Sequence, residues 1–286
     1  MTLYHFSGAG NNFLLLDGRT ADLSAYCTPE HIVALCNQYH TDGLMILGVG
    51  ADFTMEFYNP DGSGGMMCGN GGRCIAAFAD YLGIAPSDGA TYHFLAPDGP
   101  HTAELLHKDE AGWTIRLGMK DVHGVQPVLG GYFLDTGTRH YVRFVDDVET
   151  LDIETEGPRY RHDPAFAPVG ANANFVQRLP EGGIKVRTFE KGVEGETLAC
   201  GTGITASAIA AWYDARCHSE HPSCHSEHPS CHSERSEESL LAPAPIHTPG
   251  RARQDDLCVD FLPTGPATFT AVYLTGPVVL LATYDI

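Results

Sequence analysis

Basic residues are scarce in this chain of 286 residues. It has 17 Lys and Arg against 36 Asp and Glu, which gives a net charge of −19 at pH 7. Nucleic-acid binding needs clustered cations that neutralise phosphates, and anionic membrane surfaces attract the same cations. We therefore expect no nucleic acid and no membrane among the partners. A small zwitterionic substrate responds to local groups and is compatible with this charge.

Long apolar runs are also missing. The N-terminus has no basic region, and its apolar run at 13–16 is too short for a signal peptide. The most apolar stretch, near the C-terminus, is interrupted by Gly276 and Pro277, so we expect no membrane-spanning helix. Because the nine cysteines are an odd number without a secretory signal, we expect reduced thiols and a cytoplasmic location.

Nucleotide-binding signatures are absent as well, since no G-x-G-x-x-G follows a strand and no Walker lysine is present. The chain has instead two helical stretches that are apolar nearly all round, 74–82 and 204–213. A helix without a polar face belongs inside a protein. Short strands are predicted around these helices at 3–6, 13–17, 54–58, 113–117, 141–145, 185–189 and 257–262.

The two helical stretches belong to an internal repeat. Cys68-Gly-Asn-Gly-Gly precedes the first and Cys200-Gly-Thr-Gly precedes the second, and a strand with a polar turn comes before each cysteine. The two cysteines are 132 residues apart, about half of the chain. We infer two structurally equivalent halves, each built around a buried helix that follows a Cys-Gly turn.

A cysteine at a helix N-terminus has a lowered pKa, and the glycine N–H groups beside it can hold a carboxylate. Two such turns that face each other would place thiols on either side of one small acid. One thiolate could then remove a proton from carbon while the opposite thiol returns a proton to the other face. For any one cysteine, simple burial is the more common role. We retain that interpretation for Cys27, Cys36, Cys74 and Cys258.

Motifs along nearly the whole chain, except about 217–250, resemble those of the diaminopimelate epimerase family. They are Ser7-Gly-Ala-Gly-Asn-Asn-Phe13, Phe57-Tyr-Asn-Pro-Asp-Gly-Ser63, Met67-Cys-Gly-Asn-Gly-Gly-Arg-Cys74, Asn172-Ala-Asn-Phe175, Arg187-Thr-Phe-Glu-Lys-Gly192, Glu196-Thr-Leu-Ala-Cys-Gly-Thr-Gly203 and Leu274-Thr-Gly-Pro277. The resemblance implies an α/β (α+β) fold with two pseudo-symmetric halves. Each half is a curved, mostly antiparallel sheet wrapped around a central buried helix.

The resemblance also implies an activity, which is conversion of LL-2,6-diaminopimelate to the meso isomer in lysine biosynthesis. It implies a homodimer that uses neither a cofactor nor a metal. Cys200 would accept the proton of the LL substrate and Cys68 would donate one. Gly69, Asn70, Gly201 and Thr202 would hold the reacting carboxylate, and Asn11, Asn59 and Asn172 would bind mostly the distal end. His140 and Glu190 would tune the thiols and hold the reacting ammonium.

The chain departs from the family pattern at three positions. Many members carry Gln where this chain has Gly43, Asn where it has Thr138, and Arg where it has Lys191. Lys191, a further substrate-binding candidate, keeps the charge but lacks the bidentate fork that suits a carboxylate. These changes affect recognition of the distal group more than the thiol pair. Arg73 has no role assigned by the resemblance.

The domains are predicted at 1–122, completed by a C-terminal strand at 277–286, and at 123–276. The sequence CHSEHPS occurs at 217–223 and again at 224–230, within a low-complexity insertion predicted to be disordered at 217–250.

Two alternative functions remain open. A related racemase for proline or hydroxyproline would leave the Asn set with little to bind. A non-catalytic metal-binding protein would use the Cys and His residues of the repeat, but the apolar residues that separate the ligand pairs of a zinc finger are missing there.

Overall fold

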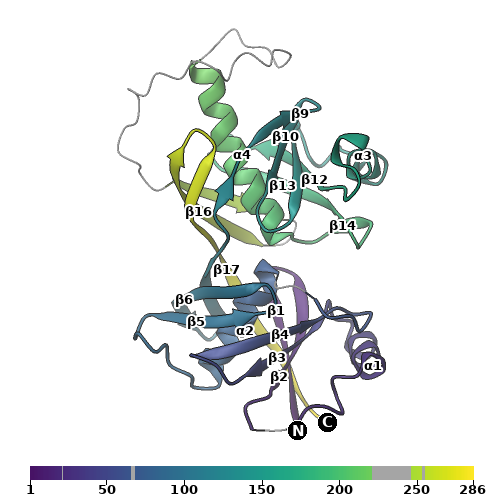
Figure 1. The fold of residues 1–286 in the computed structure, drawn as a ribbon, viewed down its shortest axis with the longest axis vertical. Helices are drawn as coiled ribbons and strands as arrows, with labels where there is room; N and C mark the ends of the chain where they lie inside the picture. Colours follow the sequence, from purple (N-terminus) through teal and green to yellow (C-terminus); the bar gives the residue numbers. More distant parts are fainter. Residues whose placement is uncertain (21, 66–67, 221–245, 253–254) are drawn as a thin grey trace. The chain divides into compact units, whose positions relative to one another are not determined.

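The computed structural model describes residues 1–286 except 21, 66–67, 221–245 and 253–254 (Figure 1). These residues divide into two compact units. Unit 1 comprises Met1–Met119, Gln254–Leu257 and Tyr273–Ile286, and unit 2 comprises Lys120–Arg253 and Cys258–Val272. The domain bounds expected from the sequence, 1–122 with 277–286 and 123–276, stay a prediction. No helix in the described part of the chain has the length and apolarity that crossing a bilayer requires.

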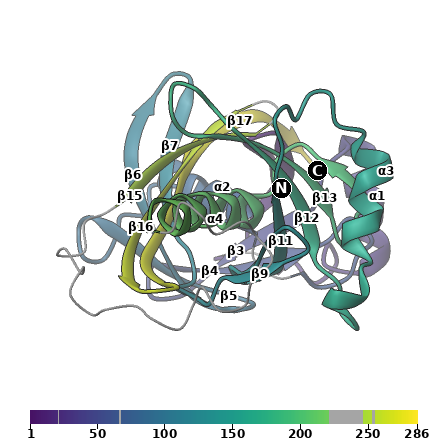
Figure 2. The same ribbon diagram turned by 90° about the horizontal axis from the view of Figure 1, so that it is seen from above.

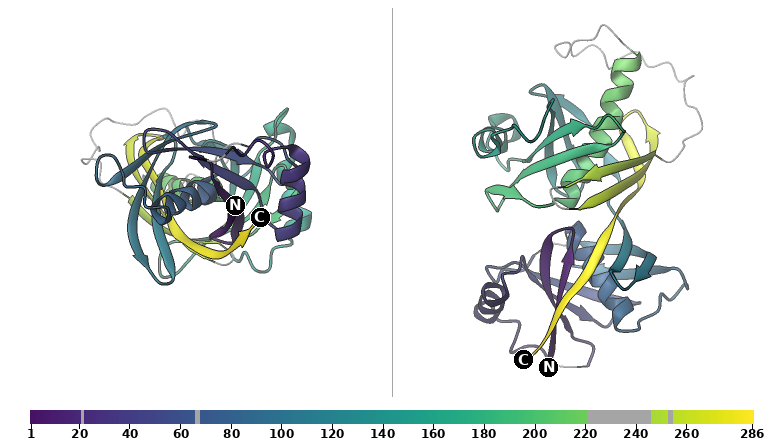
Figure 3. Two further views of the ribbon diagram at one scale, coloured as in Figure 1. Left: turned by 90° about the horizontal axis from the view of Figure 1, so that it is seen from below. Right: turned by 180° about the vertical axis from the view of Figure 1, so that it is seen from behind.

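Unit 1 builds a sheet around one buried helix, α2. Its elements are β1 (Thr2–Gly8), β2 (Asn11–Asp17), α1 (Pro29–Tyr39), β3 (Leu44–Gly48), β4 (Phe53–Tyr58), α2 (Gly69–Tyr81), β5 (Thr91–Ala96), β6 (Gly99–Asp109), β7 (Gly112–Gly118) and the last part of β17 (Thr268–Asp285). β1 pairs with both β2 and β17, so the two termini lie side by side (Figure 3). The pairs β2–β3 and β4–β5 are parallel, whereas the other pairs are antiparallel.

Unit 2 repeats this order around its own helix, α4. Its elements are β8 (Val122–His123), β9 (Gln126–Val128), β10 (Gly131–Asp135), β11 (Arg139–Phe144), α3 (Ile153–Arg161), a 3₁₀ turn (Pro164–Phe166), β12 (Asn172–Arg178), β13 (Ile184–Glu190), β14 (Gly195–Thr197), α4 (Gly201–Glu220), β15 (Ile246–Arg251), β16 (Asp256–Gly265) and the start of β17. The hairpin β10–β11 leads through α3 to β12, which lies parallel to β11, as β1–β2 leads through α1 to β3. β13 then precedes α4 as β4 precedes α2, so the predicted two-half α/β fold is confirmed.

The two central helices are buried where small side chains predominate, over most of α2 and the first half of α4, in which every residue of 201–210 except Thr202 is buried. Every residue of α2 from Gly69 to Ala79 is buried, in a core with Phe6, Phe13 and Ile115. Figure 2 shows α4 among strands of its own unit, with β15 and β16 on one side and β11 to β13 on the other. Close approach of strand to helix requires glycine at Gly8, where a Cβ would lie 2.8 Å from the Cys74 sulfur.

The predicted insertion at 217–250 needs correction at both ends. Helix α4 continues through Glu220, so the first four residues of the repeat are helical. At the other end, Ile246–Arg251 forms β15, where Gly250 and Arg251 pair in parallel with Ile184 and Lys185 of β13. Backbone pairing with a buried strand accounts for order that the composition of the segment does not suggest. Residues 221–245 lie outside the described part of the chain, and with them most of the predicted repeat.

Candidate active site

Cys68 is the N-cap of α2. Its backbone is extended, at φ −106° and ψ 152°, and its sulfur accepts a hydrogen bond from the Gly71 N–H at 3.2 Å. The first N–H groups of a helix carry partial positive charge, which favours the thiolate form of a cysteine placed there. Glycine leaves room for the sulfur, because a Cβ at Gly71 would lie 3.2 Å from it. Cys68 is therefore a half-buried thiol at the N-terminal, positive end of the α2 dipole.

Two of the predicted substrate contacts meet beside this thiol. The Asn70 side-chain amide donates to the Asn11 side-chain oxygen at 2.5 Å, and the Asn11 amide donates to the Asp42 carboxylate at 3.2 Å. Asp42 also accepts from the Asn12 N–H at 2.8 Å. The loop that carries the departure at Gly43 thus orients Asn11 through its neighbour Asp42. Unit 1 thus joins Asn11 and Asn70 directly, and the contact of either residue with substrate stays a prediction.

Arg73 is a functional candidate that the sequence left unassigned. Its side chain is fully buried, and its guanidinium donates to the Asn70 side-chain oxygen at 3.0 Å and to the Gly69 carbonyl at 3.4 Å. Burial lowers the pKa of Arg73 to about 10, so it remains cationic at neutral pH. Nearby Cys74 and Cys68 oppose part of this shift. The guanidinium therefore fixes the amide of Asn70 and adds positive charge near Cys68.

Asn59 lies in the turn after β4. Its side-chain amide donates to the Ser63 hydroxyl at 3.0 Å, and its N–H donates to the Ser63 carbonyl at 2.9 Å. These bonds shape the turn that leads towards α2. The contribution of Asn59 to substrate binding stays a prediction.

Cys200 occupies the same place in unit 2 that Cys68 occupies in unit 1. The Cys200 carbonyl accepts from the Ile204 N–H at 2.9 Å, as the Cys68 carbonyl accepts from the Gly72 N–H at 2.8 Å. Each cysteine thus provides the first carbonyl of its helix. The Cys200 side chain is 9% exposed, and its sulfur lies 3.5 Å from the Thr202 hydroxyl. The internal repeat seen in the sequence is matched by equivalent positions of the two thiols within their units.

His140 reaches this region through Thr138. The His140 Nε2 lies 2.8 Å from the Thr138 hydroxyl, which in turn lies 3.0 Å from the Thr202 hydroxyl. Burial lowers the pKa of His140 to about 3, because the fully buried ring cannot hold a charge without water or an anion. His140 is therefore a neutral hydrogen-bonding group. Thr138 occupies the position of the expected Asn. Its hydroxyl bridges His140 and Thr202, in the first turn of α4.

Three further predicted residues, Asn172, Glu190 and Lys191, lie together where β12 begins and β13 ends. Asn172, on β12, is 6% exposed and accepts from the Lys191 N–H at 2.8 Å through its side-chain oxygen. Glu190 is half-buried and pairs with Gly195 of β14, whereas the Lys191 side chain is exposed. Asn172 thus holds the backbone that follows Glu190. Gly201 and Thr202 form the first turn of α4.

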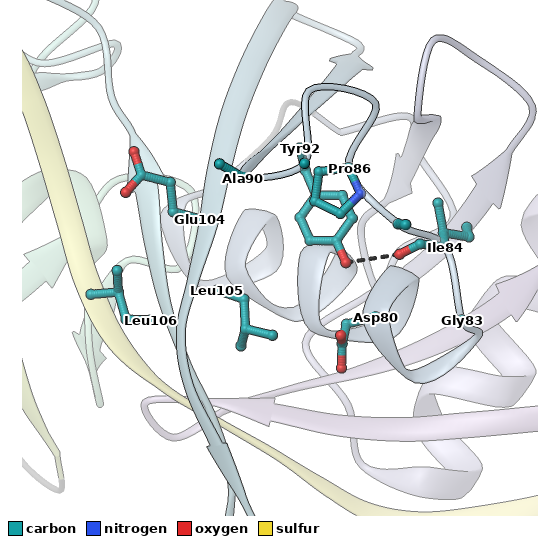
Figure 4. Close-up of a pocket in the computed structure, with 11 residues that line it drawn as sticks. Asp80, Gly83, Ile84, Pro86, Ala90, Tyr92, Glu104, Leu105 and Leu106 are labelled. Carbon is teal, nitrogen blue, oxygen red and sulfur yellow. Dashed lines mark hydrogen bonds between the residues drawn. The ribbon is translucent and has the colours of Figure 1, made fainter.

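A pocket of about 580 Å³ opens elsewhere in unit 1 (Figure 4). It lies at the C-terminal end of α2, whereas Cys68 lies at the N-terminal end. Its polar groups already have partners, since the Tyr92 hydroxyl donates to the Ile84 carbonyl and Asp80 accepts from Lys108 and Trp113. None of the predicted site residues lines it, and it is separate from the candidate active site.

Metal-ligating groups do not gather in the described part of the chain, where no cluster of three His, Cys, Asp or Glu side chains could hold an ion. Most of the Cys and His residues of the repeat lie in 221–245, outside that part. The metal-binding alternative therefore still has to be tested by experiment.

Comparison with known proteins identifies relatives over most of the chain. A family model described as diaminopimelate epimerase matches residues 132–226. The diaminopimelate epimerase of Flavobacterium psychrophilum is 40% identical over 215 residues, which cover 73% of this chain and 81% of that protein. The diaminopimelate epimerase of Chlorobaculum tepidum is 38% identical over 216 residues, which cover 72% of this chain and 81% of that protein.

A solved structure supports the fold alone. A probable proline racemase from Agrobacterium radiobacter matches with a TM-score of 0.64 and 13% identity, over 100% of this chain and 92% of that chain. At this identity the likeness extends to the architecture and not to the substrate.

Proposed function

Because this chain belongs to the diaminopimelate epimerase family, we propose that it inverts LL-2,6-diaminopimelate to the meso isomer with two thiols and no cofactor. The chain is an isomerase with a small-molecule substrate, and the family's reaction serves lysine biosynthesis. The observation that carries the mechanism is the pair Cys68 and Cys200. Each stands at the N-terminus of a buried helix, at equivalent places in two units of the same topology.

The chemical step moves two protons. The Cys200 thiolate takes the hydrogen from the α-carbon, and the electron pair that remains is delocalised into the carboxylate. The Cys68 thiol then gives its proton to the opposite face of the same carbon and becomes the thiolate. The reaction requires that the two units bring the sulfurs to opposite faces of one carbon. Charge balances without any other reactant.

Charge that develops on the carboxylate needs stabilisation in the transition state. The N–H groups of Gly69, Asn70, Gly201 and Thr202 lie in the first turns of α2 and α4 and are suited to this role. Preorganised backbone donors act without reorganising during the reaction. The positive ends of both helices would favour the anion further.

Recognition of the distal amino-acid group is assigned to the amides of Asn11, Asn59 and Asn172, with Lys191 in place of the family's Arg. His140 and Glu190 would adjust the thiols and bind the reacting ammonium. The neutral state of His140 supports a hydrogen-bonding role rather than an electrostatic one. Proline has no distal amino-acid group, so it serves as a negative control substrate.

We also propose that the protein is a cytoplasmic homodimer. Light scattering coupled to size-exclusion chromatography would give the mass of the assembly, and fractionation of cells would give its location. A monomeric mass, or recovery in a membrane or extracellular fraction, would contradict these two proposals without affecting the reaction.

Incubation of the pure protein with LL-diaminopimelate in D₂O tests the reaction. We expect solvent deuterium at the α-carbon and formation of the meso isomer, with no added pyridoxal phosphate and no loss of activity in EDTA. L-Proline under the same conditions should stay protonated. Absolute dependence on pyridoxal phosphate or on a metal would contradict the mechanism.

Substitution of either thiol tests the two-base assignment. Cys68→Ala and Cys200→Ala should each reduce turnover by at least about a hundredfold, since each removes one general acid or base. Cys36→Ala is the matched control, because Cys36 is buried and burial raises the pKa of its thiol. Steady-state kinetics of the three variants would decide. A residual rate above about a tenth of wild type in either catalytic variant would contradict the assignment.

A further inference from the structure

Five side chains of unit 2 form a continuous series of hydrogen-bonding contacts that ends at the Cys200 sulfur. The Asn174 amide nitrogen lies 3.1 Å from His140 Nδ1, and His140 Nε2 lies 2.8 Å from the Thr138 hydroxyl. The Thr138 hydroxyl lies 3.0 Å from the Thr202 hydroxyl, which lies 3.5 Å from the Cys200 sulfur. All five belong to one unit, so the series exists independently of how the two units meet.

The direction of the series is set at Asn174. Its amide nitrogen lies 2.9 Å from the Tyr141 carbonyl and 3.4 Å from the Asn172 carbonyl, and carbonyl oxygens can only accept. Its side-chain oxygen accepts from the Thr188 hydroxyl at 2.9 Å. The amide is therefore fixed with its nitrogen towards His140. It can only donate to His140 Nδ1.

The donor at Asn174 determines which nitrogen of His140 donates in turn. In a neutral imidazole one nitrogen accepts and the other carries the proton. Since Nδ1 accepts from Asn174, the proton lies on Nε2 and is donated to the Thr138 oxygen. Complete burial of the ring favours its neutral form. The tautomer of His140 is thus set by Asn174 and not by Thr138.

The hydroxyls of Thr138 and Thr202 connect His140 to the Cys200 sulfur. Each carries one hydrogen, so Thr138, which accepts from His140, is left to donate to Thr202. Thr202 then has its own hydrogen available for the Cys200 sulfur. A hydrogen bond donated to sulfur stabilises the thiolate over the thiol. A reversed series would have Thr202 accept from the thiol and so favour the protonated form.

We propose that Asn174 is a positioning residue that sets the tautomer of His140 and so directs a hydrogen-bond donor to Cys200. The proposal deepens the proposed function, because it rests on Cys200 as the base. Gly203, the second glycine of the Cys200 turn, supports it. A Cβ at Gly203 would lie 2.4 Å from the Asn174 side-chain oxygen, so glycine is needed for Asn174 to keep this position.

The tautomer can be observed directly, with no substrate. In protein labelled with ¹⁵N-histidine, the His140 signals are identified by their loss in His140→Gln. We expect the Nε2-protonated tautomer in wild type and a shift to the Nδ1-protonated form in Asn174→Asp, whose carboxylate accepts where the amide donates. An Nδ1-protonated ring in the wild type would overturn the proposal.

Alkylation of the thiols tests the far end of the series. Iodoacetamide is added at pH 7, and the rates at Cys200 and Cys68 are followed separately by mass spectrometry. Thr138→Val should slow alkylation at Cys200 about three- to tenfold, the effect of one lost hydrogen bond, and leave Cys68 unchanged. Thr138→Ser should restore the rate. Thr138 is exposed, so these variants should fold.

Thr205→Val is the matched control, since the buried Thr205 hydroxyl donates to the Gly201 carbonyl and lies outside the series. Loosening of the structure would speed alkylation, because it would expose the sulfur, whereas loss of the donor slows it. The proposal would be overturned if Cys200 were alkylated as fast in Thr138→Val as in the Thr205→Val control, or if Thr138→Ser did not restore the alkylation rate. Failure of the D₂O experiment with these results intact would reject the proposed function and leave the positioning role standing.

Discussion

Arg73 shows how one buried side chain can organise several polar groups. Its guanidinium bonds to Asn70, which bonds to Asn11, which bonds to Asp42. Unit 1 therefore has an ordered polar network beside Cys68, as unit 2 has one beside Cys200. In both units a fully buried group, Arg73 or His140, anchors polar side chains of this network.

Arg73→Lys should destabilise the protein by about 1.5–3 kcal/mol, because an ammonium cannot reproduce the two bonds of the planar guanidinium and would stay buried. It should also lower kcat/KM, since Asn70 and Asn11 lose their orientation. Urea denaturation and steady-state kinetics give the two quantities. Arg159→Lys is the control, because that arginine is largely exposed in α3 and should change stability by less than about 0.5 kcal/mol. Equal stability of the two variants would contradict the anchoring role.

The sequence identifies the two cysteines and four of the asparagines as site candidates, but it does not identify Asn174 or Arg73. One signal for Asn174 was available, because residues two apart on a strand share a face and Asn172 was already a candidate. Arg73 is a cation within an otherwise apolar helix, which is unusual unless the charge has a partner. Neither signal names the partner. Tyr141 becomes a neighbour of Asn174 only because β11 and β12 pair. Gly69 lies one helical turn before Arg73, in a segment whose glycines predict a turn and not a helix.

The central helices begin earlier than the sequence pattern suggests. The apolar pattern predicts helix at 74–82 and 204–213, whereas α2 begins at Gly69 and α4 at Gly201. Glycine costs about 1 kcal/mol in a helix, so a glycine-rich segment indicates a turn. Burial of these first turns and the cap at Cys68 offset that cost. The glycine turns are thus the first turns of the helices, which places their N–H groups at the thiols.

The last strand also differs from its prediction, for a related reason. β17 runs from Thr268 to Asp285 through Gly276 and Pro277, where an interruption was expected. Pro277 pairs with Thr114 of β7. A Cβ at Gly276 would lie 2.2 Å from the Leu257 side chain and 3.2 Å from the Arg73 guanidinium, so glycine lets the strand pass both groups. Packing against Leu257 and Arg73 explains a glycine that interrupts the apolar stretch in the sequence.

Gly203→Ala tests whether the first turn of α4 is shaped by its surroundings. In an isolated helix this change would stabilise by about 1 kcal/mol. Here the new Cβ would meet the Asn174 side-chain oxygen, which accepts from Thr188. The Asn174 amide nitrogen donates to carbonyls of β11 and β12, so the side chain cannot move away easily, and we expect destabilisation of about 1–3 kcal/mol. Gly195→Ala is the control, because no atom lies within 4 Å of its Cβ. Thermal melts that place Gly203→Ala at or above wild type would refute the expectation.

At the scale of the whole molecule, a deletion can test whether the repeat at 217–239 is needed for activity and stability. Deletion of 221–239 retains α4 as described and removes most of the Cys and His residues. We expect kcat/KM and Tm to stay nearly unchanged, since each doubling of a loop's length costs only about 0.6 kcal/mol and the segment has little apolar surface. Both proteins are measured with and without zinc. A loss above tenfold, or stabilisation of the full chain alone by stoichiometric zinc, would favour the metal-binding alternative.

Oxidation can test whether Cys68 and Cys200 act on one substrate. The proposed mechanism requires the two sulfurs to reach opposite faces of one carbon, so it predicts that they can be cross-linked when the substrate is absent. A disulfide needs Cα atoms within about 7 Å, and a thiolate of lowered pKa speeds its formation. A mild oxidant should therefore abolish activity, and reductant should restore it. Mass spectrometry should identify a Cys68–Cys200 cross-link, which Cys36→Ala leaves intact and either catalytic Ala variant removes. Full activity after oxidation, with both thiols still open to alkylation, would mean that the two cysteines do not share a substrate.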